Sequence, residues 1–129
     1  ARKISGAEGF LIMFHVQNHN DFIWWNIGGW NNTRTAVERA WSGSKSQLGA
    51  ASSVTVQTNR WYDIKVEVQG TNIKCYLDGT LIHDTNDSQT ATDPVYASAS
   101  RDLASGGSPG LTATWLVSVP GKAIEILFE

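Results

Sequence analysis

The sequence predicts an all-β fold, an antiparallel β-sandwich. Hydrophobic and polar residues alternate with a period of two in several short segments, and turn-forming residues separate those segments at regular intervals. No segment shows the 3.6-residue period of an amphipathic helix. The chain has 129 residues, enough for one domain with a hydrophobic core, so we expect residues 1–129 to form a single domain.

Residues 9–41 are expected to form three strands. The almost continuous apolar run at 9–16 is typical of a strand covered on both faces, which places it centrally in a sheet. Residues 21–28 and 34–41 flank a segment, 28–32, whose glycines and asparagines tolerate the positive φ of a chain reversal. We expect these two segments to pair as a long hairpin.

The following residues predict a loop and then a three-stranded meander. Residues 42–53 are small and polar, so we expect a loop there. Residues 61–68 alternate apolar and charged side chains, and turns at 69–72 and 78–79 separate them from strands at 73–77 and 80–83. Further strands are expected at 95–100, 111–119 and 123–128.

Composition excludes several classes of partner. Hydrophobic residues make up 41% and charged residues 17% of the chain, and no apolar run approaches the roughly 18 residues of a membrane span. The formal net charge of −2 carries no block of one sign, so we expect neither nucleic acid nor an anionic membrane as partner. The single cysteine, Cys75, excludes an intramolecular disulfide and a thiolate metal cage. The N-terminal residues lack the apolar region of a signal peptide, so we expect either that no signal peptide existed or that the chain is a mature or excised piece.

The segment from 22 to 33 contains three of the six tryptophans together with several asparagines. An indole ring can stack on the apolar C–H face of a sugar, while amide groups hydrogen-bond the hydroxyls around its edge. This combination indicates a carbohydrate-binding surface.

Strand parity divides that segment. If residues 22–27 are extended, Ile23, Trp25 and Ile27 share the better core face, and Trp24 and Asn26 share the other. We expect the second face to be a concave groove with the hairpin end as its rim. On the return strand Glu38 or Arg39 lies near Trp24. The predicted sugar-binding residues are Trp24, Asn26, Trp30, Asn31, Glu38 and, by its parity on another strand, Tyr76.

A structural interpretation competes with this for each aromatic residue, because tryptophans in sandwiches are more often core residues than ligand platforms. We expect Trp61 and Trp115 to be structural, and the sequence leaves Trp41 open. Glu38 has an equally ordinary alternative as a solvated or ion-paired strand residue.

Four segments carry a family resemblance: GAEGFLI at 6–12, DFIWWNIGGWNNT at 21–33, RWYDIKVEV at 60–68 and IKCYLDGTLIHD at 73–84. They resemble a non-catalytic module that accompanies the α-L-arabinofuranosidases of glycoside hydrolase family 51, a jelly-roll sandwich similar to concanavalin and laminin-G domains. The resemblance covers residues 6–102 and implies a carbohydrate-binding module of a secreted enzyme that degrades plant cell walls. Residues 103–129 depart from that pattern, and whether this atypical tail completes the sandwich is left open.

Catalysis and tightly bound cofactors are not expected. Glycoside hydrolysis needs two carboxyl groups placed together, whereas Glu8, Glu38 and Glu67 are isolated in the sequence. His15 and His19 are spaced for a helix but lie on a predicted strand and loop, so a zinc site is not expected. The loops at 18–21 and 84–87 contain oxygen ligands for a structural calcium ion, the one cofactor left open.

The sequence therefore predicts a module that binds plant hemicellulose, xylan or arabinoxylan, and targets a covalently attached glycoside hydrolase to it. One alternative is a structural domain whose tryptophan-rich face packs on a catalytic domain without binding sugar. Another is a small glycosidase.

Overall fold

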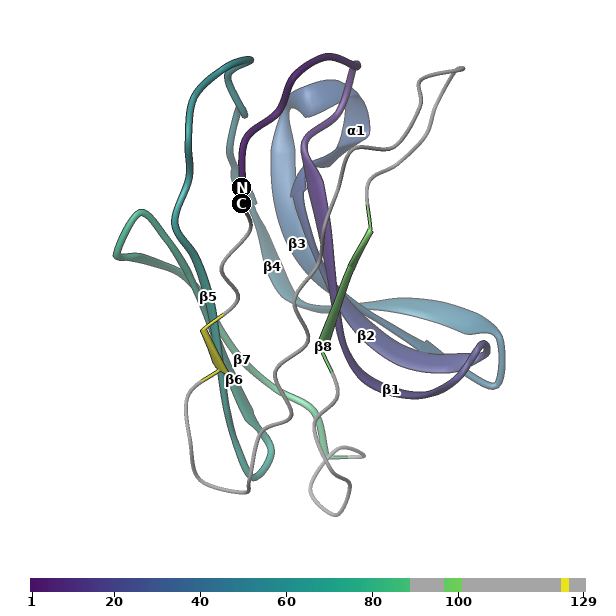
Figure 1. Cartoon of the computed structure of the whole chain (residues 1–129). Coiled ribbons are helices and arrows are strands. Elements are labelled where there is room, and N and C mark those ends of the chain that lie inside the picture. Colours follow the sequence, from purple (N-terminus) through teal and green to yellow (C-terminus); the bar gives the residue numbers. More distant parts are fainter. Residues whose placement is uncertain (89–96, 101–123, 126–129) are drawn as a thin grey trace.

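The structure is a computed structural model that describes residues 1–88, 97–100 and 124–125, and it contains two antiparallel sheets that face each other (Figure 1). The five-stranded sheet has the order β4 (Ser44–Ser53), β3 (Arg34–Trp41), β2 (Asp21–Gly28), β1 (Phe10–Asn18) and β8 (Ala97–Ser100). The four-stranded sheet has the order β7 (Thr80–Asn86), β6 (Asn72–Leu77), β5 (Ile64–Gln69) and β9 (Ile124–Glu125). The predicted antiparallel β-sandwich is confirmed.

Strands β1, β2 and β3 form the predicted central strand and long hairpin. β1 lies between β2 and β8, and β2 pairs with β3 from Phe22–Ala40 to Asn26–Ala36. The connection, α1 (Gly29–Asn32), is a reversal in which Trp30, Asn31 and Asn32 all have positive φ, rather than a right-handed helix. Gly28 precedes it at φ 69°, where a Cβ atom would lie 2.6 Å from Asn32 Oδ1. No helix in the described residues is long and apolar enough to cross a membrane.

The loop predicted at 42–53 is wrong, because β4 occupies Ser44–Ser53. Ser42 and Gly43 have φ values of 48° and 77°, and this two-residue reversal brings Trp41 opposite Ser44. β4 is an edge strand held by backbone hydrogen bonds to β3, and most of its side chains are exposed. An edge strand of this kind needs no apolar alternation, which explains why the composition indicated a loop.

The predicted meander is confirmed as β5, β6 and β7. Asp78 and Gly79, with φ values of 51° and 76°, form the tight turn between β6 and β7. β5 begins at Ile64, three residues later than predicted, and β7 extends to Asn86.

The strand predicted at 95–100 is observed at Ala97–Ser100, whereas that predicted at 111–119, with Trp115, lies outside the described residues. In the tail, Ile124–Glu125 pairs with β5, and its role in completing the sandwich stays a prediction.

The core lies between the sheets. Trp25 is fully buried beside Ile23 and Ile27, and these residues pack with the apolar inner faces of β5 and β6. The Trp25 indole N–H donates to Thr35 Oγ1 at 2.7 Å, and the same hydroxyl donates to the Asn26 carbonyl at 2.7 Å. His83 from β7 lies 3.3 Å from that hydroxyl through Nε2 and meets Trp25 edge to face. A buried polar network therefore joins the two sheets.

Candidate sugar-binding face

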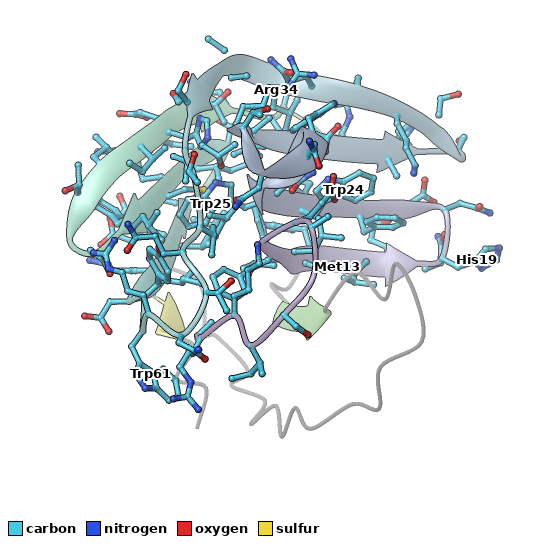
Figure 2. The ribbon with its side chains drawn as sticks, turned by 90° about the horizontal axis from the view of Figure 1, so that it is seen from above. Met13, His19, Trp24, Trp25, Arg34 and Trp61 are labelled. Carbon is cyan, nitrogen blue, oxygen red and sulfur yellow. The ribbon has the colours of Figure 1, made fainter. Side chains whose placement is uncertain are left out.

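The outer face of the five-stranded sheet carries three of the predicted site residues. Side chains alternate along β2, so Trp25 points between the sheets and Trp24 points away from them (Figure 2). Asn26 has the same parity as Trp24, and Glu38 lies opposite Trp24 on β3. The predicted core set of Ile23, Trp25 and Ile27 is confirmed.

Strand register aligns four outer-face side chains in one row across β1 to β4. Met13 is opposite Trp24, Trp24 is opposite Glu38, and Glu38 is opposite Gln47. Directly opposite side chains in antiparallel strands have Cβ atoms about 4.5–5.5 Å apart, so the row forms one continuous surface. Met13 lies beside Trp24 in Figure 2. We call Met13, Trp24, Glu38 and Gln47 the central row.

Trp24 is held tightly within this row. Its indole N–H donates to Glu38 Oε2 at 2.5 Å, the Phe22 ring centroid lies 5.0 Å from its own, and the Lys45 ammonium lies 5.0 Å from the indole centroid. Only 9% of Trp24 is exposed. The open platform predicted for Trp24 is therefore mostly covered, and a ligand that stacks on the ring must displace a neighbour. Lys45, an exposed and unbranched side chain, can move most readily.

Two polar groups on this face have free hydrogen-bonding capacity. Within residues 1–88, the second carboxylate oxygen of Glu38, Oε1, accepts no hydrogen bond, and the half-buried Asn26 side chain makes none. The Asn26 amide packs directly over Gly29, where an added Cβ would lie 2.4 Å from its nitrogen. A carboxylate oxygen and an amide, both beside an indole, match the acceptors and donors that sugar hydroxyls need.

The predicted rim residues lie at the end of the β2–β3 hairpin. The Arg34 guanidinium carbon lies 4.0 Å from the Trp30 ring centroid. The Asn31 backbone N–H donates to Glu8 Oε1 at 3.1 Å, and the Asn31 side chain is exposed. Asn32 is structural, because its side chain both donates to the Val56 carbonyl and accepts from the Val56 N–H.

Tyr76 is not brought to this face. It lies on β6, on the outer face of the other sheet, where its hydroxyl donates to Glu67 Oε2 at 3.0 Å. That hydrogen bond is the main cause that raises the pKa of Tyr76, and the Lys65 and Tyr76 bonds lower the pKa of Glu67. Parity predicted that Tyr76 points outward, but parity within one strand does not show which sheet the strand joins.

Arg39, the alternative to Glu38, belongs to the sandwich interior. It has the parity of Val37 and donates to Asp87 Oδ1 at 2.7 Å, and the Asp87 side chain is 1% exposed.

Among the other tryptophans, Trp61 was predicted to be structural but is 54% exposed, and Trp41 is also exposed. The sequence did not single out Met13, Gln47, Phe22 or Lys45. The outward parity of Met13 and Phe22 was readable, whereas that of Gln47 and Lys45 was not, because residues 42–53 were predicted to be a loop. The alignment of all four with Trp24 depends on strand register.

The described residues contain no group of three His, Cys, Asp or Glu side chains able to hold a metal ion. In the loop at 18–21, Asp21 accepts hydrogen bonds from the Asn18 amide and the Ser42 N–H, at 2.7 and 2.6 Å. The Ser42 bond is the main cause that lowers the pKa of Asp21. These oxygens therefore stabilise the β1–β2 turn and join it to the β3–β4 turn at Ser42, and a structural calcium ion stays a prediction.

Comparison with known proteins gives three similarities. Residues 5–111 match the profile of the 3-keto-alpha-glucoside-1,2-lyase-like domain. An extracellular exo-alpha-L-arabinofuranosidase from Streptomyces chartreusis is 48% identical over 79 residues, which is 61% of this chain and 10% of that protein. The chain thus spans about a tenth of that relative's length.

The structural similarity concerns the fold alone. The carbohydrate-binding module CBM66 from Bacillus subtilis superposes with a TM-score of 0.57 at 18% sequence identity, over 76% of this chain and 58% of that module. Together these similarities confirm the expected resemblance to a carbohydrate-binding-like sandwich that is related to part of an arabinofuranosidase.

Proposed function

Because the chain belongs to the 3-keto-alpha-glucoside-1,2-lyase-like domain family, we propose that it is a non-catalytic member that binds plant cell-wall polysaccharide. The preferred ligand in this proposal is xylan or arabinoxylan. The module would act outside the cell and hold a covalently attached glycoside hydrolase on its substrate. The similarity to an extracellular exo-alpha-L-arabinofuranosidase and to a carbohydrate-binding module supports this role.

The single observation that carries the proposal is the Trp24–Glu38 pair on the outer sheet face. Glu38 Oε2 accepts the hydrogen bond from the indole N–H, and Oε1, which accepts none within residues 1–88, is available to a sugar hydroxyl. In our proposal Lys45 moves aside, a sugar ring stacks against Trp24, and Glu38 and Asn26 bind its hydroxyls. Such shallow, hydrated sites have dissociation constants of about micromolar to millimolar, or about −8 to −4 kcal/mol.

The test is affinity electrophoresis in gels with soluble arabinoxylan. Glu38→Gln keeps an acceptor for the Trp24 N–H but removes the charge, so we expect a weaker retardation of a folded protein. Tyr76→Phe is the matched control, because it removes a polar atom from the outer face of the other sheet and should leave retardation unchanged. Lys45→Ala should preserve or strengthen binding. Equal retardation of Glu38→Gln and the unchanged protein would place the sugar elsewhere.

A non-catalytic role for this chain also has a direct test. In β1 to β4 the carboxylates are Asp21 and Glu38, and both oxygens of Asp21 accept hydrogen bonds, from Asn18 and Ser42. We expect purified protein to release no reducing sugar from arabinoxylan and to leave 3-keto-α-glucosides intact. Product formation that is lost in Glu38→Gln would show that this face is catalytic.

A second candidate function is docking on the attached catalytic domain, and the surface around Trp61 favours it. Trp61 is 54% and Ile4 is 51% exposed, and Arg2 lies over the Trp61 ring at 5.2 Å. Exposed apolar patches often mark protein contacts, and the Arg2–Trp61 β-bridge brings the N-terminal segment that contains Ile4 to this surface. If docking is the function, Trp61→Ser should weaken association with the separately produced hydrolase domain and leave arabinoxylan retardation unchanged.

A further inference from the structure

The rim of the candidate face contains a second recognition element, the Arg34 guanidinium stacked on Trp30. We propose that Arg34 binds the carboxylate of an acidic sugar, a uronic acid residue carried by the polysaccharide. This inference rests on the proposed sugar-binding function and extends it from neutral to acidic polysaccharides.

Arg34 lies on the same face as the central row. It has the parity of Ala36 and Glu38 on β3, where successive residues point to opposite sides. Arg34 lies four positions before Glu38 on the same strand, a span of about 13 Å. A ligand of more than one sugar ring, bound at Trp24 and Glu38 and lying along β3, therefore reaches the guanidinium.

The guanidinium is held in place but has no acidic partner among residues 1–88. Residues 1–88 contain four arginines, and two of them, Arg39 and Arg60, pair with Asp87 at 2.7 Å and Asp78 at 2.6 Å. No carboxylate in that part of the chain lies within 4.0 Å of Arg34, although the side chain is exposed and stacks at 4.0 Å from the Trp30 centroid. Stacking uses the flat face of the group and leaves the N–H donors at its edge for a ligand.

A carboxylate is the ligand chemistry that these donors fit best. The planar fork of arginine forms two parallel hydrogen bonds with a carboxylate, stronger and more directional than a bond to a hydroxyl. The stacked arrangement reduces the side-chain freedom that must be lost on binding. On a face proposed to bind polysaccharide, the carboxylate that reaches this rim is that of a uronic acid.

The rim backbone keeps this pair in position. Trp30 adopts φ 50°, and the Thr33 hydroxyl donates to its carbonyl at 2.8 Å. Asn32 fastens the same turn to Val56 with bonds of 2.8 and 2.9 Å. Trp30 is thus presented by a turn with little freedom, and Arg34 follows it at the first position of β3.

Calorimetric titration can test the inference with a set of matched oligosaccharides. The set contains a neutral xylo-oligosaccharide, the same chain with a glucuronic acid branch, that branched chain after reduction of its carboxyl group, and an oligogalacturonide. Arg34→Gln removes the charge, and Arg34→Lys keeps the charge but loses the fork. Arg2→Gln is the control, because Arg2 also stacks on a tryptophan, Trp61 at 5.2 Å, away from this face.

We expect the unchanged protein and Arg2→Gln to bind the glucuronic acid ligand about 3- to 10-fold more tightly than the neutral one. That advantage should vanish after carboxyl reduction and in Arg34→Gln, shrink in Arg34→Lys, and fall at high salt. Tighter binding of the oligogalacturonide, again dependent on Arg34, would support the inference with a pectic source of the carboxylate.

Two outcomes would overturn it, and they differ. Equal binding of neutral and acidic ligands, unaffected at Arg34, would refute carboxylate recognition and leave the proposed sugar binding intact. Failure of every ligand to bind a protein shown by tryptophan fluorescence to be folded would refute the proposed function and this extension together.

Discussion

Replacing Thr35 with valine should show how much the buried network between the sheets contributes to stability. The Thr35 hydroxyl accepts the Trp25 indole N–H and donates to the Asn26 carbonyl, both at 2.7 Å. Valine has nearly the same shape, so the substitution creates no large cavity. It leaves a fully buried indole N–H without its acceptor, which costs about 1–3 kcal/mol, and the second lost bond adds about 1 kcal/mol. We expect the free energy of unfolding to fall by about 2–4 kcal/mol, a large part of a typical 5–15 kcal/mol.

Urea denaturation followed by tryptophan fluorescence measures this change. The midpoint should fall while the dependence of free energy on urea stays the same, because the surface exposed on unfolding is unaltered. Thr80→Val is the control, since Thr80 is exposed at the start of β7, and it should change stability by less than about 0.5 kcal/mol. An equally small effect for Thr35→Val would refute the network's role. Arabinoxylan retardation should be the same for both variants, because the Thr35 side chain is buried between the sheets and does not reach the outer face.

Three further predictions concern residues whose roles the structure defines. Burial lowers the pKa of His83, so the unfolded chain binds a proton at this histidine more readily than the folded chain does. The free energy of unfolding should therefore fall as pH drops below about 6.5. In urea titrations between pH 7 and 5, His83→Gln should reduce this dependence on pH. Asp87→Asn should lower the free energy of unfolding by about 2–3 kcal/mol, measured by the same titrations, because it removes the charge that faces Arg39. Asn32→Ala should lower the free energy of unfolding by about 2 kcal/mol, because it loses both hydrogen bonds to Val56. Asn32→Gly loses the same bonds but should cost less, because glycine tolerates φ 61°. Thermal unfolding can rank the two variants, and the reverse order would contradict this account.

The fold was largely predictable because most strands carry a clear period-two pattern. The meander of β5 to β7 is an example: alternation in residues 61–68 and the Asp78-Gly79 turn required no tertiary information. β4 was not predictable by the same means. Its residues pair with β3 through backbone groups that any side chain possesses, so composition indicated a loop while the Ser42-Gly43 reversal was the only local sign of a hairpin.

The candidate site was only partly predictable, because it depends on register between strands. Parity along β2 separates Trp24 from Trp25, and this division needs only the sequence. The position of Glu38 opposite Trp24 requires the register of the hairpin, and that of Met13 requires the pairing of β1. The placement of Tyr76 was predicted wrongly for the same reason. The sequence shows that Tyr76 points outward from its strand, but not that β6 belongs to the other sheet, away from Trp24 and Glu38.

The two adjacent tryptophans show why the carboxylate on the outer face supports a binding role. Both indole N–H groups need an acceptor, and a neutral hydroxyl, that of Thr35, is sufficient for the fully buried Trp25. Trp24 instead donates to Glu38, a charged group whose desolvation costs more than that of a hydroxyl. The carboxylate differs in having a second oxygen, Oε1, which the described residues leave unbonded and which a sugar hydroxyl can reach.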